Sequence, residues 1–305
     1  MSNGSIRLLF TRLRTEEKLL AEAAGKRALP FVIENVRDAV FPGLQDSEDI
    51  FLCRCIGHHQ NLAVARMLER SGFRTVNSSR VMELCGDKVA TSSVLQEAGI
   101  PQPRYRVALS REGALQAAEE LGYPVVFKPA TGSWGRLLAK VQDAETAEAI
   151  AEHKEHLGPQ HQVFYIQEWV EKDGFDIRAF IIGGEPVCAI RRYSGHWITN
   201  TARGGSATEH PLHEDLRSLL LRIYDAIQGD FLAVDLFLTK GGYLVNEIND
   251  GAEFRNSIAP TGEDIPGRVV ELCASLLKRK PSTTGGNKPA CKIANPRGPE
   301  VTNLH

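Results

Sequence analysis

Short apolar runs alternate with helical patterns along the first 87 residues, and this alternation constrains the fold more than any other feature of the chain. The apolar runs occupy 6–10, 30–36, 49–57 and 73–77, and helical periodicity separates them at 16–26 and 61–70. Strands that alternate with helices form parallel sheets, because each crossover helix returns the chain to the same edge. We therefore expect an α/β domain over residues 1–87.

A second, smaller α+β domain is expected over residues 88–165. Helical patterns at 87–98, 111–121 and 144–156 enclose the β-type runs RYRVAL, YPVVFKP and LLAKV. Gly99 and Gly122 follow the first two helices directly, as glycine commonly does at a helix end.

A third domain is expected over residues 166–280. Its pattern begins with the strand FYIQEWV and continues with two antiparallel strands around Gly183–Gly184. A helix at 213–227 precedes a hairpin about residues 240–242, and a helix at 266–278 closes the domain. Residues 281–305 are rich in Pro, Gly, Asn, Ser and Thr without periodicity, which predicts a flexible tail.

Composition excludes several classes of protein. Charged residues make up 24% of the chain and the net charge is −2, so no polybasic surface for nucleic acid or lipid is expected. No apolar run approaches the length of a membrane span, and the N-terminus lacks a signal-peptide pattern. The six cysteines are scattered and lack the spacing of zinc ligands or of a disulfide framework. We expect a cytoplasmic globular protein.

Lys88, Lys128 and a glycine turn form the first candidate site. Lys128 ends the β-run VVFKP, and the turn Gly132-Ser133-Trp134-Gly135-Arg136 follows it. A strand lysine near free backbone N–H groups can bind phosphate oxygens. The alternative is an ordinary hairpin with a surface lysine.

A second candidate is Gln167-Glu168-Trp169-Val170 with Asp176 and Arg178, which can bind an adenine edge, ribose and phosphate. The alternative is an amphipathic strand whose charged residues lie on its solvent-exposed face.

The hairpin formed by AVDLF and VNEIN carries the third candidate site. Glu247 and Asn249 lie two residues apart and share one strand face, toward which Asp235 on the partner strand can point. Carboxylates inside a β-core cost several kcal/mol each to desolvate, unless a partner offsets that cost. An all-oxygen ligand set predicts Mg²⁺. Otherwise one acid is solvent-facing and the other is salt-bridged.

Two polar segments are further candidates. Arg192 precedes Asn200-Thr201-Ala202-Arg203-Gly204-Gly205, and arginine suits recognition of carboxylate or phosphate. A second segment follows the strand that carries Glu247 and Asn249, where it could select a second substrate. It is Glu253-Phe254-Arg255-Asn256-Ser257. The alternatives are a plain loop and a helix start capped by Asn or Ser.

Taken together, these motifs resemble one family over about residues 5–278. GDK at 86–88, GSWGRLL at 132–138, YIQEWVEK at 165–172, DIRAF at 176–180 and HWITNTARGG at 196–205 are similar to ATP-grasp ligases related to ribosomal-protein modification enzymes. Within them, the chain resembles the LysX-type α-aminoadipate–carrier-protein ligases. The resemblance implies an ATP-grasp fold behind an N-terminal Rossmann-like pre-ATP-grasp domain.

The resemblance also implies roles for individual residues. ATP would contact Lys88, Lys128, the loop through Leu137 and Leu138, the stretch from Gln167 to Arg178, and Asn200. Asp235, Glu247 and Asn249 would hold Mg²⁺, with two ions expected. Arg178, Arg192 and Lys128 would act in catalysis by lowering charge repulsion. The substrate side would be Arg192, Thr201, Ala202, Arg203 and the segment Glu253 to Ser257.

In such ligases the C-terminal glutamate side chain of a small acidic carrier protein, LysW in type, is phosphorylated by ATP and then joined to the α-amino group of the amino acid. Asn256-Ser257 resembles the α-aminoadipate branch of lysine biosynthesis, whereas Gly-Phe resembles the glutamate branch. Asp250-Gly251-Ala252 departs from the pattern and bears on the size of the pocket. The alternatives are glutamate as amino acid, a peptide or ribosomal-protein glutamate ligase, and an ATP-binding module without ligation. A homo-oligomer is expected by resemblance alone.

Overall fold

The computed structural model describes residues 4–41, 48–132, 137–197, 199 and 205–278. Its chain divides into two compact units, residues 1–76 with the end of the last helix from Cys273, and residues 77–272. The expected tail 281–305 lies outside the described residues. No helix in the described ranges is long and apolar enough to cross a bilayer.

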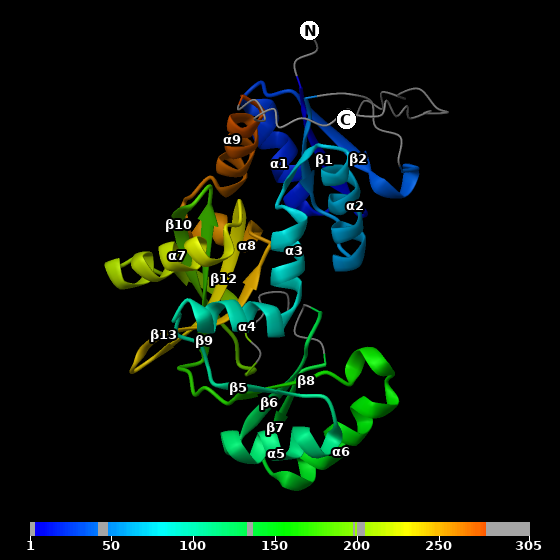
Figure 1. The fold of residues 1–305 in the computed structure, drawn as a ribbon. Coiled ribbons are helices and arrows are strands. Elements are labelled where there is room, and N and C mark those ends of the chain that lie inside the picture. The colour runs from blue at the N-terminus through cyan, green and yellow to red at the C-terminus, as the bar shows by residue number, and fades with distance from the viewer. Residues whose placement is uncertain (1–3, 42–47, 133–136, 198, 200–204, 279–305) are drawn as a thin grey trace. The chain divides into compact units, whose positions relative to one another are not determined.

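The first unit contains the predicted parallel sheet (Figure 1). Its strands lie in the order β2-β1-β3-β4, and every pair between neighbours is parallel. Their bounds are β1 Ile6–Phe10, β2 Phe31–Asn35, β3 Ile50–Cys53 and β4 Arg74–Val76, with α1 Thr15–Lys26, η1 Val36–Asp38 and α2 His58–Arg70 as connections. The alternation of apolar runs and helices therefore predicted the parallel sheet of this unit correctly.

The second unit begins with two consecutive helices. α3 spans Ser79–Gly86 and α4 spans Lys88–Glu97. α3 was not predicted from the sequence, although Ser78 caps it by accepting a hydrogen bond from the Val81 N–H. The Asp87 side chain caps α4 in the same way, so Lys88 becomes its first residue.

A four-stranded sheet in the order β5-β8-β6-β7 follows, with α5 and α6 packed on one face (Figure 1). The elements are β5 Tyr105–Ala108, α5 Arg111–Leu121, β6 Val125–Pro129, β7 Ala139–Val141, α6 Ala144–His156, η2 Pro159–His161 and β8 Phe164–Glu168. One expectation is corrected here. The strand FYIQEWV was assigned to the third domain, but β8 pairs with β5 and β6 and belongs to this sheet.

A five-stranded antiparallel sheet in the order β11-β10-β9-β12-β13 carries the predicted metal hairpin. Its strands are β9 Phe175–Ile182, β10 Glu185–Tyr193, β11 Ser206–Glu209, β12 Phe231–Thr239 and β13 Gly242–Asn249. The helices are α7 Glu214–Ile227, α8 Arg255–Thr261 and α9 Ile265–Lys278. Apolar residues of one sheet face pack against α3, α4 and α7, and the charged residues Arg178, Asp235 and Glu247 lie on the opposite face.

Candidate functional site

Two lysines converge on strand β13. The Lys128 side chain is buried, and its Nζ donates to Asn246 Oδ1 at 2.8 Å. Lys88 Nζ lies 3.2 Å from Glu247 Oε1 and donates to the Gly132 carbonyl at 3.0 Å. Burial lowers the pKa of Lys128 to about 7, although the nearby Glu247 carboxylate acts in the opposite direction. The two lysines predicted to bind phosphate are therefore placed together.

The predicted phosphate loop is described only at its ends. Ser133, Trp134, Gly135 and Arg136 lie outside the described residues. Gly132 has a φ of +120°, a conformation that favours glycine. Leu137 is exposed and Leu138 is also among the described residues. The structure thus places Gly132 against Lys88, and the role of the remaining loop stays a prediction.

A row of charged side chains crosses the five-stranded sheet. Arg178, Asp235 and Glu247 are direct neighbours on β9, β12 and β13, so all three lie on one face. Arg178 donates to both oxygens of Asp235 at 2.8 Å. Burial raises the pKa of Asp235, but Arg178 and Arg192 outweigh it and hold that pKa well below its usual range. Asp235 is therefore a carboxylate in this site.

A second row lies one step along the strands. Arg192 on β10 faces Asp176 on β9, and its guanidinium donates to both carboxylate oxygens at 2.7 and 2.8 Å. Arg192 also lies 3.1 Å from Asp235 Oδ2, which joins the two rows. Although burial lowers the pKa of Arg192, Asp235 and Asp176 together raise it. Both Arg192 and Asp176 are buried, so any contact of theirs with substrate or ribose stays a prediction.

Lys172 is a cation of this site that lies within the stretch from Gln167 to Arg178 but was not predicted by itself. Its Nζ donates to Thr199 Oγ1 at 2.8 Å, and the Thr199 hydroxyl in turn donates to Asp176. Burial lowers the pKa of Lys172, against the attraction of Asp176. Its place at the end of the motif YIQEWVEK was the available signal.

The hairpin residues predicted to bind metal share one face and fit a hard cation. Asn249 pairs with Ala233 in the same register that sets Glu247 opposite Asp235. Its Nδ2 is buried without a hydrogen-bond partner among the described residues. Because amide nitrogen and oxygen are assigned from their partners, a flip would aim Oδ1 into this position as a ligand. Two carboxylates and one amide oxygen suit Mg²⁺, which completes its shell with phosphates and waters.

A β-bulge adds Asn246 to the site. The register shifts between Asp235 and Leu236, because Leu236 pairs with Val245 and Asn246 has no partner of its own. In a regular strand, alternation would turn Asn246 away from the face of Glu247. The bulge instead allows its side chain to accept from Lys128. Sequence alternation alone therefore missed Asn246.

The predicted adenine stretch continues from β8. Gln167 is buried, and Glu168 accepts from the Arg104 N–H and Nε at 2.8 and 2.6 Å. Lys140 Nζ lies 3.6 Å from the centre of the Trp169 ring. Val170 follows, half-buried, after the end of the strand. These contacts order the segment without testing its role in nucleotide binding.

Of the two segments expected to bind substrate, the structure describes Glu253 to Ser257 and only the end of the other. Asn200, Thr201, Ala202 and Arg203 lie outside the described residues. In the other segment, Glu253 is half-buried, Arg255 and Asn256 are exposed at the start of α8, and Ser257 is buried. Phe254 is fully buried, and its ring packs against Phe231, 6.1 Å between centres. A contact of Phe254 with substrate stays a prediction.

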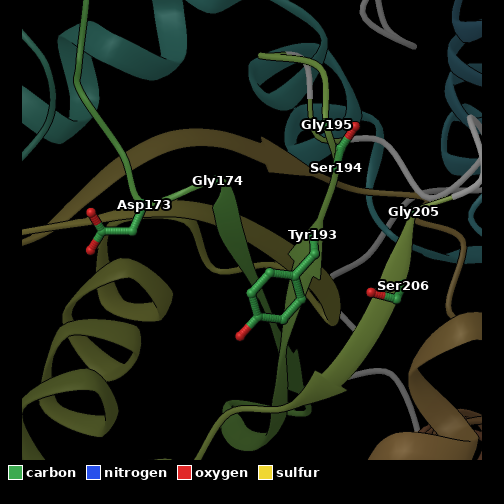
Figure 2. Close-up of a pocket in the computed structure, with 7 residues that line it drawn as sticks. All are labelled: Asp173, Gly174, Tyr193, Ser194, Gly195, Gly205 and Ser206. Atoms are coloured by element: carbon green, nitrogen blue, oxygen red, sulfur yellow. The ribbon is translucent and has the colours of Figure 1, made fainter.

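A polar pocket of about 450 Å³ lies where β10 ends and β11 begins (Figure 2). Asp173 and Gly174 of its lining belong to the stretch expected to contact ATP. Gly205 ends the predicted polar segment that begins at Asn200. The lining residues that were not predicted are Tyr193, Ser194, Gly195 and Ser206. Tyr193 alternates with the buried Arg192, so its side chain points to the opposite face of the sheet.

Comparison with known proteins agrees with this architecture. Residues 85–273 match the model of the RimK-like ATP-grasp domain, and residues 6–84 match that of the LysX preATP-grasp domain. The chain belongs to the RimK-like ATP-grasp family. The sequence-based expectations of an ATP-grasp fold and of an ATP-dependent carboxylate–amine ligase are thereby confirmed. ATP-grasp domains bind ATP together with Mg²⁺, in keeping with the oxygen ligands described above.

Relatives of both amino-acid specificities are similar to the chain. The α-aminoadipate–LysW ligase LysX of Sulfurisphaera tokodaii is 36% identical over 89% of this chain and 99% of its own length. The glutamate–LysW ligase ArgX of the same organism is 34% identical over 87% and 96%. Among solved structures, a RimK domain ATP-grasp protein of Sphaerobacter thermophilus gives a TM-score of 0.73 at 26% identity, covering 88% of this chain and 99% of that one. Identity alone does not separate the two specificities.

Proposed function

We propose that this chain ligates α-aminoadipate to a LysW-type carrier protein, forming an amide between the side-chain carboxylate of the carrier's C-terminal glutamate and the α-amino group of the amino acid. The observation that carries the proposal is the convergence of Lys88 and Lys128 on the Asp235–Glu247 hairpin. It occurs in a chain whose relatives include LysW ligases.

The first step transfers the γ-phosphoryl group of ATP to the carrier carboxylate, which gives an acyl phosphate and ADP. Repulsion between carboxylate and triphosphate opposes this step, so catalysis consists largely of positioning and of charge stabilisation. Lys88 and Lys128 would bind phosphate oxygens, and Arg178 and Arg192 would supply further positive charge. Mg²⁺ held by Asp235, Glu247 and Asn249 would neutralise triphosphate oxygens when bound.

The acidic residues of the site keep the arginines in place for this role. Asp176 and Asp235 bind the two guanidinium groups in fixed, bidentate geometry. Because each carboxylate oxygen has two lone pairs, Asp235 can accept from an arginine and still offer a lone pair to a metal. We propose two ions for the full site, and magnesium stoichiometry in the presence of ADP would test that number.

In the second step the α-amino group attacks the acyl carbon, and phosphate leaves as the amide forms. The deprotonated amine is the nucleophile, so no nucleophilic side chain of the protein is required. The choice of α-aminoadipate rests on Asn256 and Ser257, since Gly-Phe would accompany glutamate at these positions. A homo-oligomer stays a prediction from resemblance.

The test is a phosphate-release assay with ATP, Mg²⁺, a carrier that ends in glutamate, and either amino acid. We expect release to need all components, and the carrier mass to increase by the amino acid less one water. A carrier with a C-terminal glutamine is the control and should be inactive. Preference for glutamate would favour arginine biosynthesis, and ligation without a carrier would refute the carrier itself. An absence of phosphate release would leave only a nucleotide-binding module.

A further inference from the structure

Lys154 is a buried lysine that none of the predicted sites includes. It lies in the last turn of α6, and its residue is 8% exposed. Its Nζ lies 5.2 Å from the centre of the Phe164 ring. Within the described ranges no carboxylate forms an ion pair with it, and burial lowers its pKa. A buried ammonium without a carboxylate costs stability, which a methionine of similar length would avoid.

The hydrogen-bond partner of Lys154 lies next to the predicted nucleotide site. Its Nζ donates to the backbone carbonyl of Lys128 at 3.3 Å, at the point where β6 passes into the segment that leads to the phosphate loop. α6 packs on the face of the small sheet that carries Phe127, whereas the Lys128 side chain points to the opposite face. Lys154 therefore contacts the backbone of Lys128 and does not point into the predicted nucleotide site.

Three alternate carbonyls of this segment are held by lysine donors. Lys154 Nζ binds the carbonyl of Lys128, the Lys88 N–H binds that of Ala130 at 2.8 Å, and Lys88 Nζ binds that of Gly132 at 3.0 Å. These three contacts together hold the backbone from Lys128 to Gly132 at separate points along its length. Only the first of them comes from outside the predicted nucleotide site.

We propose that Lys154 is a positioning residue for nucleotide binding, which fixes the end of β6 so that the Lys128 side chain faces the phosphates. The inference rests on the proposed role of Lys128. It predicts that loss of the ammonium weakens ATP binding while the fold stays as stable or becomes more stable. A purely structural lysine would show the reverse, because its removal would lower stability and leave the affinity for ATP unchanged.

Lys154→Met tests the proposal because it keeps the length of the stem and removes the charge. We expect KM for ATP to rise about tenfold, the effect of one lost hydrogen bond from a charged donor. KM for the amino acid should stay at the wild-type value, and Tm should be unchanged or higher. Lys154→Arg, which keeps charge and donors, should recover most of the affinity. His156→Met alters an exposed residue of the same helical turn and should behave as wild type.

Lys128→Met, measured alongside, separates this inference from the proposed site. If Lys128→Met loses affinity for ATP while folded Lys154→Met keeps it, only the positioning role is overturned. If both variants bind ATP as wild type does, the nucleotide site and the inference fall together. An equal rise of KM for ATP and amino acid, with a lower Tm, would indicate general loosening and would also overturn the inference. Lys154→Gln carries the same expectation should the methionine variant fail to fold.

Discussion

Asp235 and Glu247 lie directly opposite each other on β12 and β13, and the β-bulge beside them brings Asn246 to Lys128. Two carboxylates at this spacing repel each other, and three cations offset that repulsion. Arg178 and Arg192 bind Asp235, while Lys88 binds Glu247. The hairpin is therefore built to carry negative charge, which is what a nucleotide-bound Mg²⁺ requires.

The first prediction concerns this metal site. Glu247→Gln keeps the shape of the side chain and removes its charge, so turnover should fall on the order of a hundredfold or more, as expected for loss of metal-based charge stabilisation. The Mg²⁺ concentration that gives half-maximal turnover should also rise. A magnesium titration of phosphate release measures both effects. Glu214→Gln, in the first turn of α7, is the control. Wild-type dependence on Mg²⁺ in Glu247→Gln would exclude Glu247 as a ligand.

A second prediction concerns Lys128. Lys128→Ala removes the buried ammonium that faces β13, so addition of ATP with Mg²⁺ should no longer raise Tm, because stabilisation by a ligand follows its affinity. Thermal unfolding with and without ATP measures this change. Lys240→Ala removes an exposed lysine of the turn between β12 and β13 and should keep the wild-type shift. A folded Lys128→Ala protein with the wild-type shift would mean that phosphate binds elsewhere.

The sequence predicted most of the fold because its patterns are local. Residues 111–121 and 144–156 are helices with the predicted bounds, since each has a serine or aspartate cap and an apolar stripe. The hairpin of β12 and β13 was also predicted, because two apolar runs flank a glycine turn. By contrast, the membership of β8 depends on pairing with β5, about 60 residues away in the chain, which no local pattern encodes.

The candidate site was predictable where alternation holds and was missed where it fails. Glu247 and Asn249 were placed on one face because strand side chains repeat every second residue. Asn246 was missed because a bulge interrupts that repeat. The packing of Phe254 on Phe231 was not predicted, since an aromatic residue next to polar residues carries no sign of burial in sequence alone.

A third prediction concerns pH. His210 is buried, its Nδ1 accepts from Arg191 Nε at 3.1 Å, and its Nε2 lies 3.0 Å from the Tyr243 hydroxyl. Burial first, and then Arg191, lower its pKa from 6.5 to about 4. Between these values the unfolded chain binds a proton that the folded chain does not. Stability from His210 is therefore complete above pH 6.5 and is lost as the pH falls toward 4.

Urea unfolding between pH 4 and 7.5 measures this dependence. His210→Gln stays neutral throughout, so its free energy of unfolding should decline less than that of the wild type as the pH falls from 6.5. His153→Gln, which alters an exposed histidine of α6, should keep the wild-type slope. Equal slopes in wild type and His210→Gln would show that His210 does not titrate differently in the folded protein.

The last prediction concerns the choice of amino acid. Asn256 is exposed at the start of α8, whereas Ser257 is buried one residue later. α-Aminoadipate exceeds glutamate by one methylene, which an apolar wall alone distinguishes by roughly 1–3 kcal/mol. A polar side chain that binds the distal carboxylate at the longer reach adds to this, because glutamate would leave it unpaired. Asn256→Gly/Ser257→Phe should therefore shift the ratio of kcat/KM values toward glutamate.

The burial of Ser257 affects how this experiment is read. Phenylalanine at buried position 257 overpacks the core, at a cost of roughly 1–3 kcal/mol, so part of the double variant can be inactive. The ratio of kcat/KM for the two amino acids is independent of that inactive fraction and is the quantity to compare. Asn256→Gly alone leaves the core intact, and it should account for most of the shift because Asn256 is the exposed member of the pair. If neither variant changes the ratio, the two residues merely begin α8, and the selection must come from another part of the pocket.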